Sequence, residues 1–140
     1  MISRALIVDK DKVLLLHRFK DGREYFVLPG GHIEENESEE EALVREVKEE
    51  TNLKIQIDKR LWSLFNQFDD TEYHVFFVTK FSGNLKLGGP ELEKSSKDNV
   101  FLLEWHDLKD VEKLNLVPKL LKTKIITRQI KNYLNKKYLL

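Results

Sequence analysis

The chain has 140 residues, of which 41% are apolar and 34% charged, and its formal net charge is zero, a composition typical of a soluble globular protein with one hydrophobic core. The absence of cysteine excludes disulfides and thiolate metal sites. No apolar run approaches the roughly 18 residues that span a bilayer, and the N-terminus lacks the pattern of a secretory signal. We therefore expect one domain, residues 1–140, located in the cytoplasm and without a membrane partner.

The N-terminal part of the chain predicts short β-strands separated by tight turns. Apolar runs bounded by turn residues are typical of strands. The strands predicted here are Ala5–Val8, Val13–Phe19 and Tyr25–Leu28. The first two flank Asp9–Lys12 and predict a β-hairpin, and the third ends at Pro29-Gly30-Gly31.

The remainder of the chain predicts a helix, a second β-rich part and further helices. The helix runs from Glu39 to about Thr51. The later elements are β-rich Leu53–Phe68, the strands Tyr73–Phe81 and Phe101–Trp105, a short helix at Asp107–Leu114 and a longer one at about 118–136. This order predicts an α/β (α+β) fold with a mixed sheet and helices on its faces. The 17-residue polar stretch Gly83–Asn99 is long for a loop, and long loops are often functional.

The charges are distributed unevenly along the chain. Nine glutamates stand against two basic residues between Glu34 and Glu50, whereas eight Lys or Arg and no Asp or Glu follow from Lys113 onwards. A solvated helix face accounts for the basic segment. The acidic segment carries more information in its spacing than in its charge.

The helix that follows Ser38 gathers carboxylates on one face. Ser38 is a natural N-cap, and Glu41 three residues later completes a capping-box pattern. The apolar stripe for the core comprises Ala42, Leu43 and Val47. The carboxylates at positions i, i+3 and i+4 on a different face are Glu46, Glu49 and Glu50.

Like charges at these spacings weaken a helix by about a few tenths of a kcal/mol per pair, a cost that a bound cation removes. Hard divalent cations prefer oxygen ligands, and neither cysteine nor a histidine on this helix favours zinc. The predicted cofactor is therefore Mg²⁺, with Mn²⁺ as the second choice. The spacing alone is equally consistent with a charged, solvent-exposed face. The preceding Gly30-Gly31 pair favours the metal, because glycine lets the backbone approach a ligand closely.

The segment Gly31–Leu53 resembles the Nudix box, G-x5-E-x7-R-E-U-x-E-E-x-G-U, in which U is a bulky aliphatic residue. Eight of the nine fixed positions are met, by Gly31, Glu37, Arg45, Glu46, Val47, Glu49, Glu50 and Leu53. Asn52 replaces the second glycine at a position after the helix end, where a left-handed residue is wanted and Asn is a common substitute. The resemblance extends over roughly Ala5 to Leu114, because Leu28–Gly31 and Trp105-x-x-Leu108 also match the family's usual pattern.

The resemblance implies a Nudix-like α/β/α sandwich and a Nudix-type pyrophosphohydrolase. The implied reaction is Mg²⁺-dependent hydrolysis of a pyrophosphate bond in a nucleoside diphosphate linked to another group, with a nucleoside triphosphate or another small nucleotide favoured. The implied metal ligands are Glu46, Glu49 and Glu50, with Glu37 and the Gly31 carbonyl as further candidates. Among the catalytic residues, Arg45 orients the glutamates by ion pairing.

The resemblance leaves the general base and the substrate contacts open. A base comes either from the box or from a later loop, where Glu91 is preferred to Glu93 and a polar surface loop is the alternative. Asp98 and Glu104 are weaker candidates. The candidate substrate-binding residues are Arg18, Gly30, His32 and Glu93. A packed or solvated position is the preferred interpretation for His17 and His74. For Trp62, Phe65 and Tyr73 core packing is preferred to stacking on a base.

The basic C-terminal helix supports an alternative from another function class, a catalytically inactive nucleotide-sensing or nucleic-acid-binding module on the same fold. Nucleic acid is not favoured as a partner, because every acidic position of the box is present. The helix also offers apolar residues for a homodimer interface or, as we prefer, for packing on the domain. These residues are Leu120, Leu121, Ile125, Ile126, Ile130 and Leu134. The expected partner is a small-molecule nucleotide, bound by a monomer or a homodimer.

Overall fold

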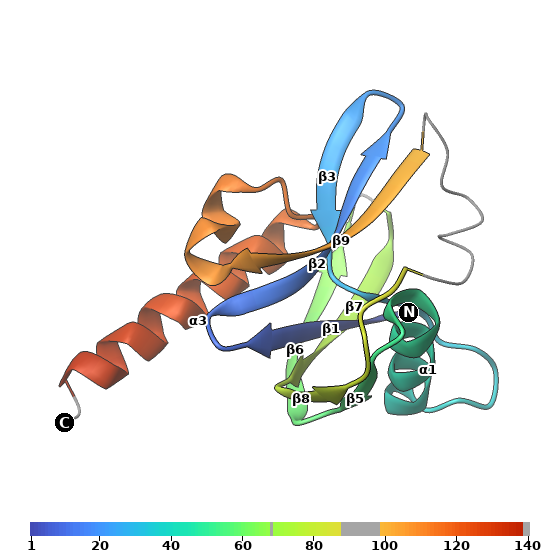
Figure 1. The fold of residues 1–140 in the computed structure, drawn as a ribbon, viewed down its shortest axis with the longest axis horizontal. Helices are drawn as coiled ribbons and strands as arrows, with labels where there is room; N and C mark the ends of the chain where they lie inside the picture. Colours follow the sequence, from blue (N-terminus) through green and yellow to red (C-terminus); the bar gives the residue numbers. More distant parts are fainter. Residues whose placement is uncertain (68, 88–98, 139–140) are drawn as a thin grey trace.

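The computed structural model describes residues 1–67, 69–87 and 99–138, with side chains described up to residue 128. Its strands are β1 (Ile2–Asp9), β2 (Lys12–Lys20), β3 (Arg23–Val27), β4 (Gly30–His32), β5 (Lys54–Gln56), β6 (Lys59–Asn66), β7 (Thr71–Val78), β8 (Lys80–Ser82) and β9 (Asn99–Asp107). Its helices are α1 (Glu39–Thr51), the 3₁₀ helix η1 (Leu108–Lys113) and α3 (Lys119–Tyr138). Figure 1 shows these elements along the chain.

The strands form a mixed sheet that opens into two halves. β1 pairs in parallel with β7 and antiparallel with β4, and β6 joins the outer side of β7. β2 lies between β3 and β9, antiparallel to both. The two halves are joined by the pairing of β1 with β2. This pairing is short and covers the two register positions next to the hairpin turn. Beyond the turn β1 and β2 separate, so that β2, β3 and β9 diverge from the rest of the sheet (Figure 1).

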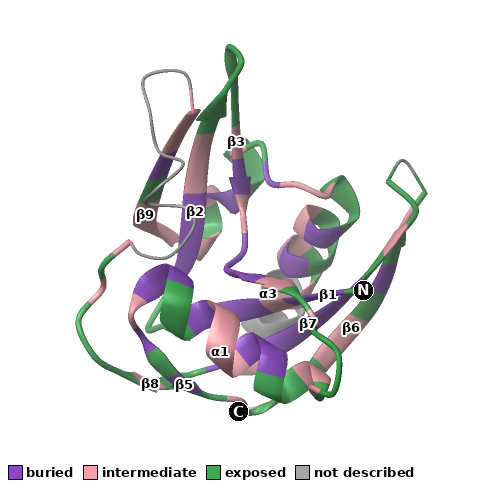
Figure 2. Cartoon of the chain, turned by 90° about the vertical axis from the view of Figure 1, so that its right-hand side faces the viewer, coloured by how far each residue is buried: buried purple, intermediate pink, exposed green. Residues whose placement is uncertain are grey.

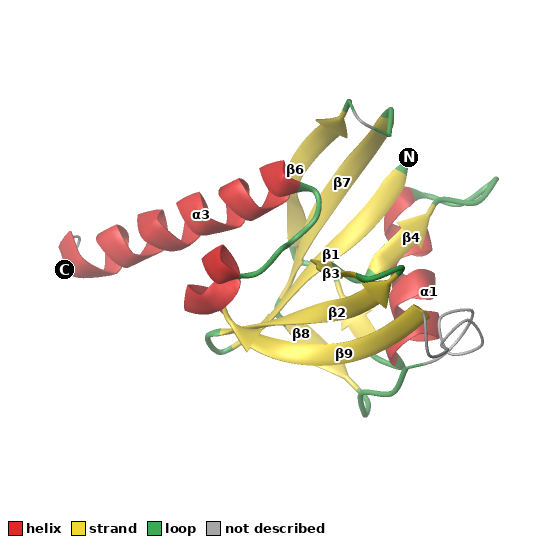
Figure 3. Ribbon diagram, turned by 90° about the horizontal axis from the view of Figure 1, so that it is seen from above, coloured by secondary structure: helices red, strands yellow, loops and turns green. Residues whose placement is uncertain are grey.

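Helices cover both faces of this sheet, as the sequence predicts, and Figure 3 shows the strands between α1 and α3. The buried stripe of α1 packs against one face together with Ile7, Leu14 and Phe76. The opposite core contains Val111 of η1 and residues of β1, β2 and β7. Buried and exposed segments alternate along α1, because one side of the helix meets the sheet and the other meets solvent (Figure 2).

The first turns of α3 belong to the core. Leu121 is 1% and Ile125 2% exposed, so both pack on the domain, whereas Leu120 is 47% exposed. Arg128 lies over the ring of Phe77 at 5.0 Å from its centroid. Side chains beyond residue 128, including Ile130 and Leu134, lie outside the described part of the chain. Across the described residues, no helix combines the length and apolarity that crossing a bilayer requires.

The predicted strand Tyr73–Phe81 is two strands that belong to different sheets. β7 ends at Val78, and β8 pairs with β5 in a separate two-stranded sheet. At the break, both the N–H and the hydroxyl of Thr79 donate to Asp58 Oδ2, at 2.8 and 2.7 Å. This capture of Thr79 by Asp58 redirects the chain, and no local pattern in the sequence announces it. The predicted helix at Asp107–Leu114 is a 3₁₀ helix.

Both ends of α1 have the local structure that the sequence predicts. Ser38 Oγ accepts from the Glu41 N–H at 3.1 Å and the Ser38 N–H donates to Glu41 Oε1 at 3.2 Å, which completes the capping box. Asn52 adopts the left-handed conformation, with φ of 68°, and its N–H donates to the Lys48 carbonyl. Its side-chain amide also donates to the Asn84 carbonyl at 2.8 Å. Asn52 therefore ends the helix and ties it to the segment after β8.

Two substitutions of Asn52 separate the contribution of its positive φ from that of its side-chain amide contact. Asn52→Gly keeps easy access to positive φ and loses the amide contact, whereas Asn52→Ala loses both. We expect the alanine variant to have a free energy of unfolding about 1 kcal/mol lower than the glycine variant, because a Cβ disfavours the left-handed conformation. Urea unfolding of the three proteins measures this difference. Equal stability of the two variants would contradict a requirement for positive φ at this position.

Candidate functional site

Arg45, on the exposed side of α1, lies at the centre of a cluster of glutamates. Its Nε and Nη2 donate to the two oxygens of Glu37 at 2.7 and 2.9 Å, a bidentate contact. Its Nη1 lies 3.2 Å from Glu46 Oε1 and 3.4 Å from Glu49 Oε2, and 3.7 Å from Glu34. Arg45 Nη2 also donates to the His32 carbonyl at 3.3 Å. One guanidinium thus joins α1, β4 and the loop between them.

The protonation equilibria of this cluster follow from these contacts. The hydrogen bonds from Arg45 and from the Glu34 N–H lower the pKa of the Glu37 carboxyl, and they outweigh the opposing effect of burial. The hydrogen bond with Glu37, followed by that with Glu46, raises the pKa of Arg45 although burial opposes it. Glu37 is therefore an anion at neutral pH and Arg45 its permanent counter-ion.

Two glycines of β4 bring the backbone against the glutamates of α1. A Cβ built on Gly31 would lie 2.6 Å from the Glu46 Cδ atom, so a side chain at this position would displace the Glu46 carboxylate from its place against β4. The N–H of Gly30 donates to Glu50 Oε1 at 3.1 Å, and Glu50 is 2% exposed. The carboxylates of Glu46 and Glu50 are thereby positioned by main-chain atoms of the adjacent strand.

The donor atoms at this position suit a hard divalent cation, because they are carboxylate oxygens beside a backbone strand. Among the side chains that the structure describes, no three of His, Cys, Asp or Glu converge on a common metal position. The glutamates are instead bridged by Arg45, which stands as the cation between them. The space above Gly31, which lacks a Cβ, admits the Glu46 carboxylate and fits the expected ligand set.

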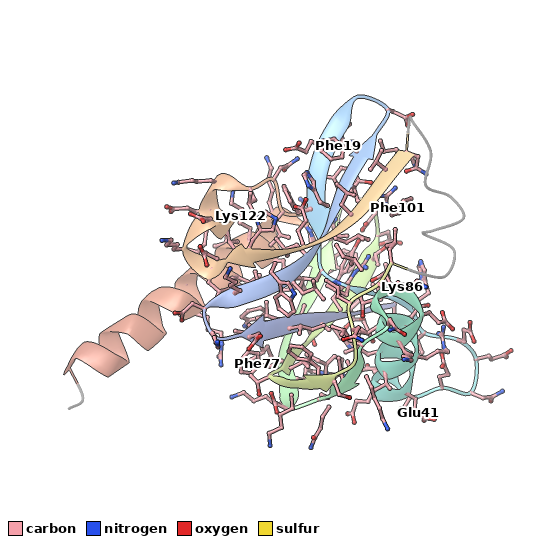
Figure 4. The ribbon with its side chains drawn as sticks, viewed as in Figure 1. Phe19, Glu41, Phe77, Lys86, Phe101 and Lys122 are labelled. Carbon is pink, nitrogen blue, oxygen red and sulfur yellow. The ribbon has the colours of Figure 1, made fainter. Side chains whose placement is uncertain are left out.

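The candidate phosphate-binding residue Arg18 lies on a different element from this cluster. It shares a face of the sheet with Tyr25 of β3 and Phe101 of β9, its register partners, and alternation puts it on the same face as Leu14 beneath α1. Its guanidinium lies 3.7 Å from the Phe101 ring centroid, and Nη2 donates to Asn99 Oδ1 at 2.8 Å. Figure 4 shows Phe101 on the diverging half of the sheet.

Comparison with known proteins decides the family. The model of the NUDIX domain matches residues 2–125. This chain belongs to the NUDIX domain family. It is 36% identical over 115 residues to an ADP-ribose pyrophosphatase of Methanocaldococcus jannaschii, an alignment that covers 77% of this chain and 62% of that protein. It is 29% identical over 120 residues to the uncharacterized Nudix hydrolase YvcI of Bacillus subtilis, covering 84% and 72% of the two chains.

Solved structures share the fold. One structure comes from a study of MutT from Aliivibrio salmonicida and Vibrio cholerae. It superposes on this chain with a TM-score of 0.70 at 20% sequence identity, and the match covers 91% of this chain and 96% of that chain. An Ap4A hydrolase of C. elegans has a TM-score of 0.67 at 20% identity, covering 97% and 99%. The predicted α/β Nudix fold and the assignment to the Nudix pyrophosphohydrolases are therefore confirmed. Enzymes of this family generally use divalent metal ions.

The structure brings most of the predicted Nudix-box residues together and separates others. Contacts join Arg45 to Glu37, Glu46, Glu49 and the His32 carbonyl, and Glu50 to Gly30. The loop candidates Glu91, Glu93 and Asp98, with Gly88-Gly89-Pro90, lie outside the described residues. Sequence reasoning missed Glu34 and Asn99, which contact Arg45 and Arg18. The run of glutamates between Glu34 and Glu50 was the available signal for Glu34; for Asn99 there was none.

Glu104, a weaker candidate for the base, lies on the face of the sheet away from the Nudix-box helix. It is the register partner of Leu15, whose side chain packs in the core of η1 and α3. Its Oε1 lies 2.9 Å from His17 Nδ1 and 2.8 Å from His106 Nε2. Phe26 stacks on the His17 ring at 4.1 Å. Glu104 and His17 thus form a packed polar cluster remote from the box, as expected for His17.

Core packing is predicted for three further aromatic residues in strands, and two of them pack against the core. Tyr73 is 8% exposed and belongs to the core on the α3 side, and its hydroxyl donates to Asp69 Oδ2 at 2.8 Å. Trp62 is partly buried against the same core. Phe65 is 58% exposed and lies outside it.

We expect the contacts of Glu104 to make the free energy of unfolding depend on pH in the acidic range. Burial raises the pKa of Glu104, but hydrogen bonds with His17 and His106 outweigh this, so the pKa is below its ordinary value. A carboxyl with a lowered pKa stabilises the folded state above its unfolded-state pKa, and the contribution is lost as pH falls through the lower folded-state pKa. We expect the stability of Glu104→Gln to depend less steeply on pH below about pH 5 than that of the wild type. Urea unfolding at several acidic pH values measures this slope, with the exposed Glu112→Gln as control; parallel slopes for wild type and Glu104→Gln would contradict the assignment.

Proposed function

We propose that residues 1–140 form one catalytic domain that uses Mg²⁺, or Mn²⁺ in its place, to hydrolyse a pyrophosphate bond in a nucleoside diphosphate linked to another group. A nucleoside triphosphate or another small nucleotide is the favoured substrate. The observation that supports this proposal most directly is the cluster of Glu37, Glu46 and Glu49 around Arg45, beside a glycine that leaves space for the Glu46 carboxylate.

The residues that would hold the metal are Glu46, Glu49 and Glu50, with the Gly31 carbonyl and Glu37 as further ligands. A bound divalent ion neutralises phosphate charge and lowers the pKa of a coordinated water. The chain's own contribution is orientation. Gly30 fixes the Glu50 carboxylate through a hydrogen bond of 3.1 Å, and the Gly31 backbone limits where the Glu46 carboxylate can lie.

Arg45 is the orienting residue of the box. Its bidentate contact with Glu37, at 2.7 and 2.9 Å, is shorter than its contacts with Glu46 and Glu49, at 3.2 and 3.4 Å. Glu46 and Glu49 are therefore the contacts that Arg45 would give up if these carboxylates held a divalent cation, and its contact with Glu37 would remain. The guanidinium would then keep the loop before α1 in place and leave the two carboxylates to the metal.

On the substrate side, Arg18 is the proposed phosphate-binding residue, with Gly30, His32 and Glu93 as further contacts and Glu91 as the base. Arg18 lies on the sheet face that continues from beneath α1, and its Nε is buried without a hydrogen bond in the described part of the chain. The 36% identical relative is named an ADP-ribose pyrophosphatase, so ADP-ribose is tested beside the nucleoside triphosphates.

The proposed metal site predicts the effect of one conservative substitution. Glu49→Gln keeps the side-chain volume and removes a ligand charge, so we expect Mg²⁺-dependent turnover to fall by at least about 100-fold while the fold is unchanged. The Glu49 side chain is 45% exposed, so its replacement leaves the core intact. Turnover at saturating Mg²⁺ and circular dichroism measure the two effects, with Glu40→Gln on the same helix as control. Wild-type turnover in Glu49→Gln would remove it from the ligand set.

A panel of substrates tests the function itself. We expect phosphate or nucleotide release from at least one of ADP-ribose, sugar nucleotides, dinucleoside polyphosphates and ordinary or oxidised nucleoside triphosphates, with Mg²⁺ or Mn²⁺ and not with EDTA. The basic helix α3, in which Lys119, Lys122 and Lys124 carry described side chains, supports the alternative of a sensing module. Tight nucleotide or RNA binding without cleavage of any panel member would favour that alternative.

A further inference from the structure

His74 is a buried polar residue beneath the first turn of the Nudix-box helix. It lies on β7 between its register partners Ser3 of β1 and Ser63 of β6, and it is 5% exposed. On the same face, the next inward-facing residue of β7 is Phe76, which packs in the apolar core beneath α1. A polar ring at this position must have partners, because an unpaired polar group costs more in the interior than in water.

Both ring nitrogens of His74 have carboxylate partners. Nδ1 lies 2.6 Å from Glu39 Oε1, and Nε2 lies 2.9 Å from Glu72 Oε1. A protonated imidazole can donate to both at once. Arg60 of β6 contacts Glu39 as well, and its Nη2 lies 3.0 Å from His74 Nδ1. Side chains from two adjacent strands, His74 and Arg60, therefore converge on one carboxylate, that of the first residue of α1.

The contacts of His74 and Arg60 with Glu39 contribute more to the geometry of α1 than to the stability of the fold. Taking ionised groups out of water offsets most of the attraction between them, so buried pairs contribute little net stability. They do enforce one geometry, because a displaced partner leaves an uncompensated charge. The side chain of Glu39 is 26% and that of His74 6% exposed, so this constraint acts at the point where α1 begins.

The two ends of α1 are held in different ways. At the C-terminal end, Asn52 donates to the Asn84 carbonyl and the Lys86 N–H donates to the Thr51 carbonyl, and Figure 4 shows Lys86 beside this end with Glu41 near the other. The capping box at the N-terminal end joins Ser38 to Glu41 within the helix itself. Glu39 instead joins the first turn to the sheet, through its side chain and through its carbonyl, which accepts from Ser3 Oγ at 3.4 Å.

We propose that His74 and Arg60 are positioning residues for the metal site: they hold the N-terminal end of α1 to the sheet through Glu39 and so fix the direction in which Glu46 and Glu49 project. Glu46 follows Glu39 by about 10 Å along the helix axis. With its C-terminal end tied, a helix released at Glu39 pivots and moves these carboxylates relative to Gly31 of β4. The inference rests on the metal site proposed above.

A matched pair of first-turn variants tests this role. Glu39→Ala and Glu40→Ala each remove one negative charge from the same turn and introduce the same helix-favouring residue, but Glu40 is exposed and Glu39 contacts His74 and Arg60. We expect Glu39→Ala to weaken Mn²⁺ binding by the nucleotide-free full chain about tenfold, as loss of supporting contacts does in other metal sites. Glu40→Ala should bind Mn²⁺ as the wild type does. Isothermal titration calorimetry or Mn²⁺ electron paramagnetic resonance measures binding without turnover.

A second pair, at His74, separates positioning from packing. The amide nitrogen of Asn takes the place of Nδ1 and can reach Glu39, whereas that of Gln takes the place of Nε2 and can reach Glu72. We expect His74→Asn to retain Mn²⁺ affinity and His74→Gln to lose it as Glu39→Ala does, although both lower the melting temperature. His106→Asn and His106→Gln, at the histidine–glutamate contact on β9, should leave Mn²⁺ affinity unchanged.

The outcomes distinguish failure of this inference from failure of the proposed function. Equal Mn²⁺ affinities within the Glu39/Glu40 pair, or within the His74 pair, would overturn the positioning role while leaving the metal site in place. A wild-type chain that binds no Mn²⁺, or binds it as Glu49→Gln does, would overturn the metal site and this inference with it.

Discussion

The guanidinium of Arg45 is the interaction on which the candidate site depends. Four glutamates lie within 3.7 Å of it, and without a cation among them their mutual repulsion would drive the loop before α1 away from the helix. The shortest contacts are those with Glu37, which belongs to that loop. Arg45 therefore has two functions in one side chain. It closes the loop over the helix, and it holds the carboxylates Glu46 and Glu49 near one another.

The other features of the domain position this cluster. Gly30 and Gly31 place the β4 backbone against Glu50 and Glu46, while the split between β1 and β2 lets β2, β3 and β9 diverge from the helix. The diverging half carries Arg18 on the face that continues from beneath α1. The acidic helix α1 thus lies beside one half of the sheet, and the basic side chain of Arg18 comes from the other half. The hairpin that joins the halves sets their relative orientation.

The sequence predicts those parts of the fold that local interactions determine. The bounds of α1 match because the Ser38 capping box and the left-handed Asn52 act within a few residues of the helix ends. The three-residue strand β4 was missed because its pairing depends on β1. The break between β7 and β8 was missed because it depends on the capture of Thr79 by Asp58, a residue distant in sequence. The 3₁₀ geometry of η1 likewise has no signature in the spacing of its residues.

The same division holds for the candidate site. The Nudix box can be recognised in the sequence because most of its fixed positions lie on one helix, and the ion-pairing role predicted for Arg45 is what the resemblance implies. The pairs Glu72–His74 and Glu104–His106 have i, i+2 spacing, which places their side chains on one face of a strand, so this signal was available. The contact between Glu39 and His74 joins distant segments and depends on how α1 lies across the sheet. No pattern along the chain encodes it.

The two glycine positions of the box differ in what substitutions they tolerate. The second requires a backbone with positive φ, which Asn52 supplies, so more than one amino acid satisfies it. At the first, a Cβ on Gly31 would lie 2.6 Å from the Glu46 Cδ atom, the flexible end of that side chain, so a substitution there would displace the carboxylate. The requirement at position 52 concerns the backbone conformation, whereas that at position 31 concerns where the Glu46 carboxylate lies. A substitution at position 52 therefore acts on the stability of the helix end, whereas one at position 31 acts on the position of a carboxylate in the candidate site, and a motif written with the letter G at both positions conceals that difference.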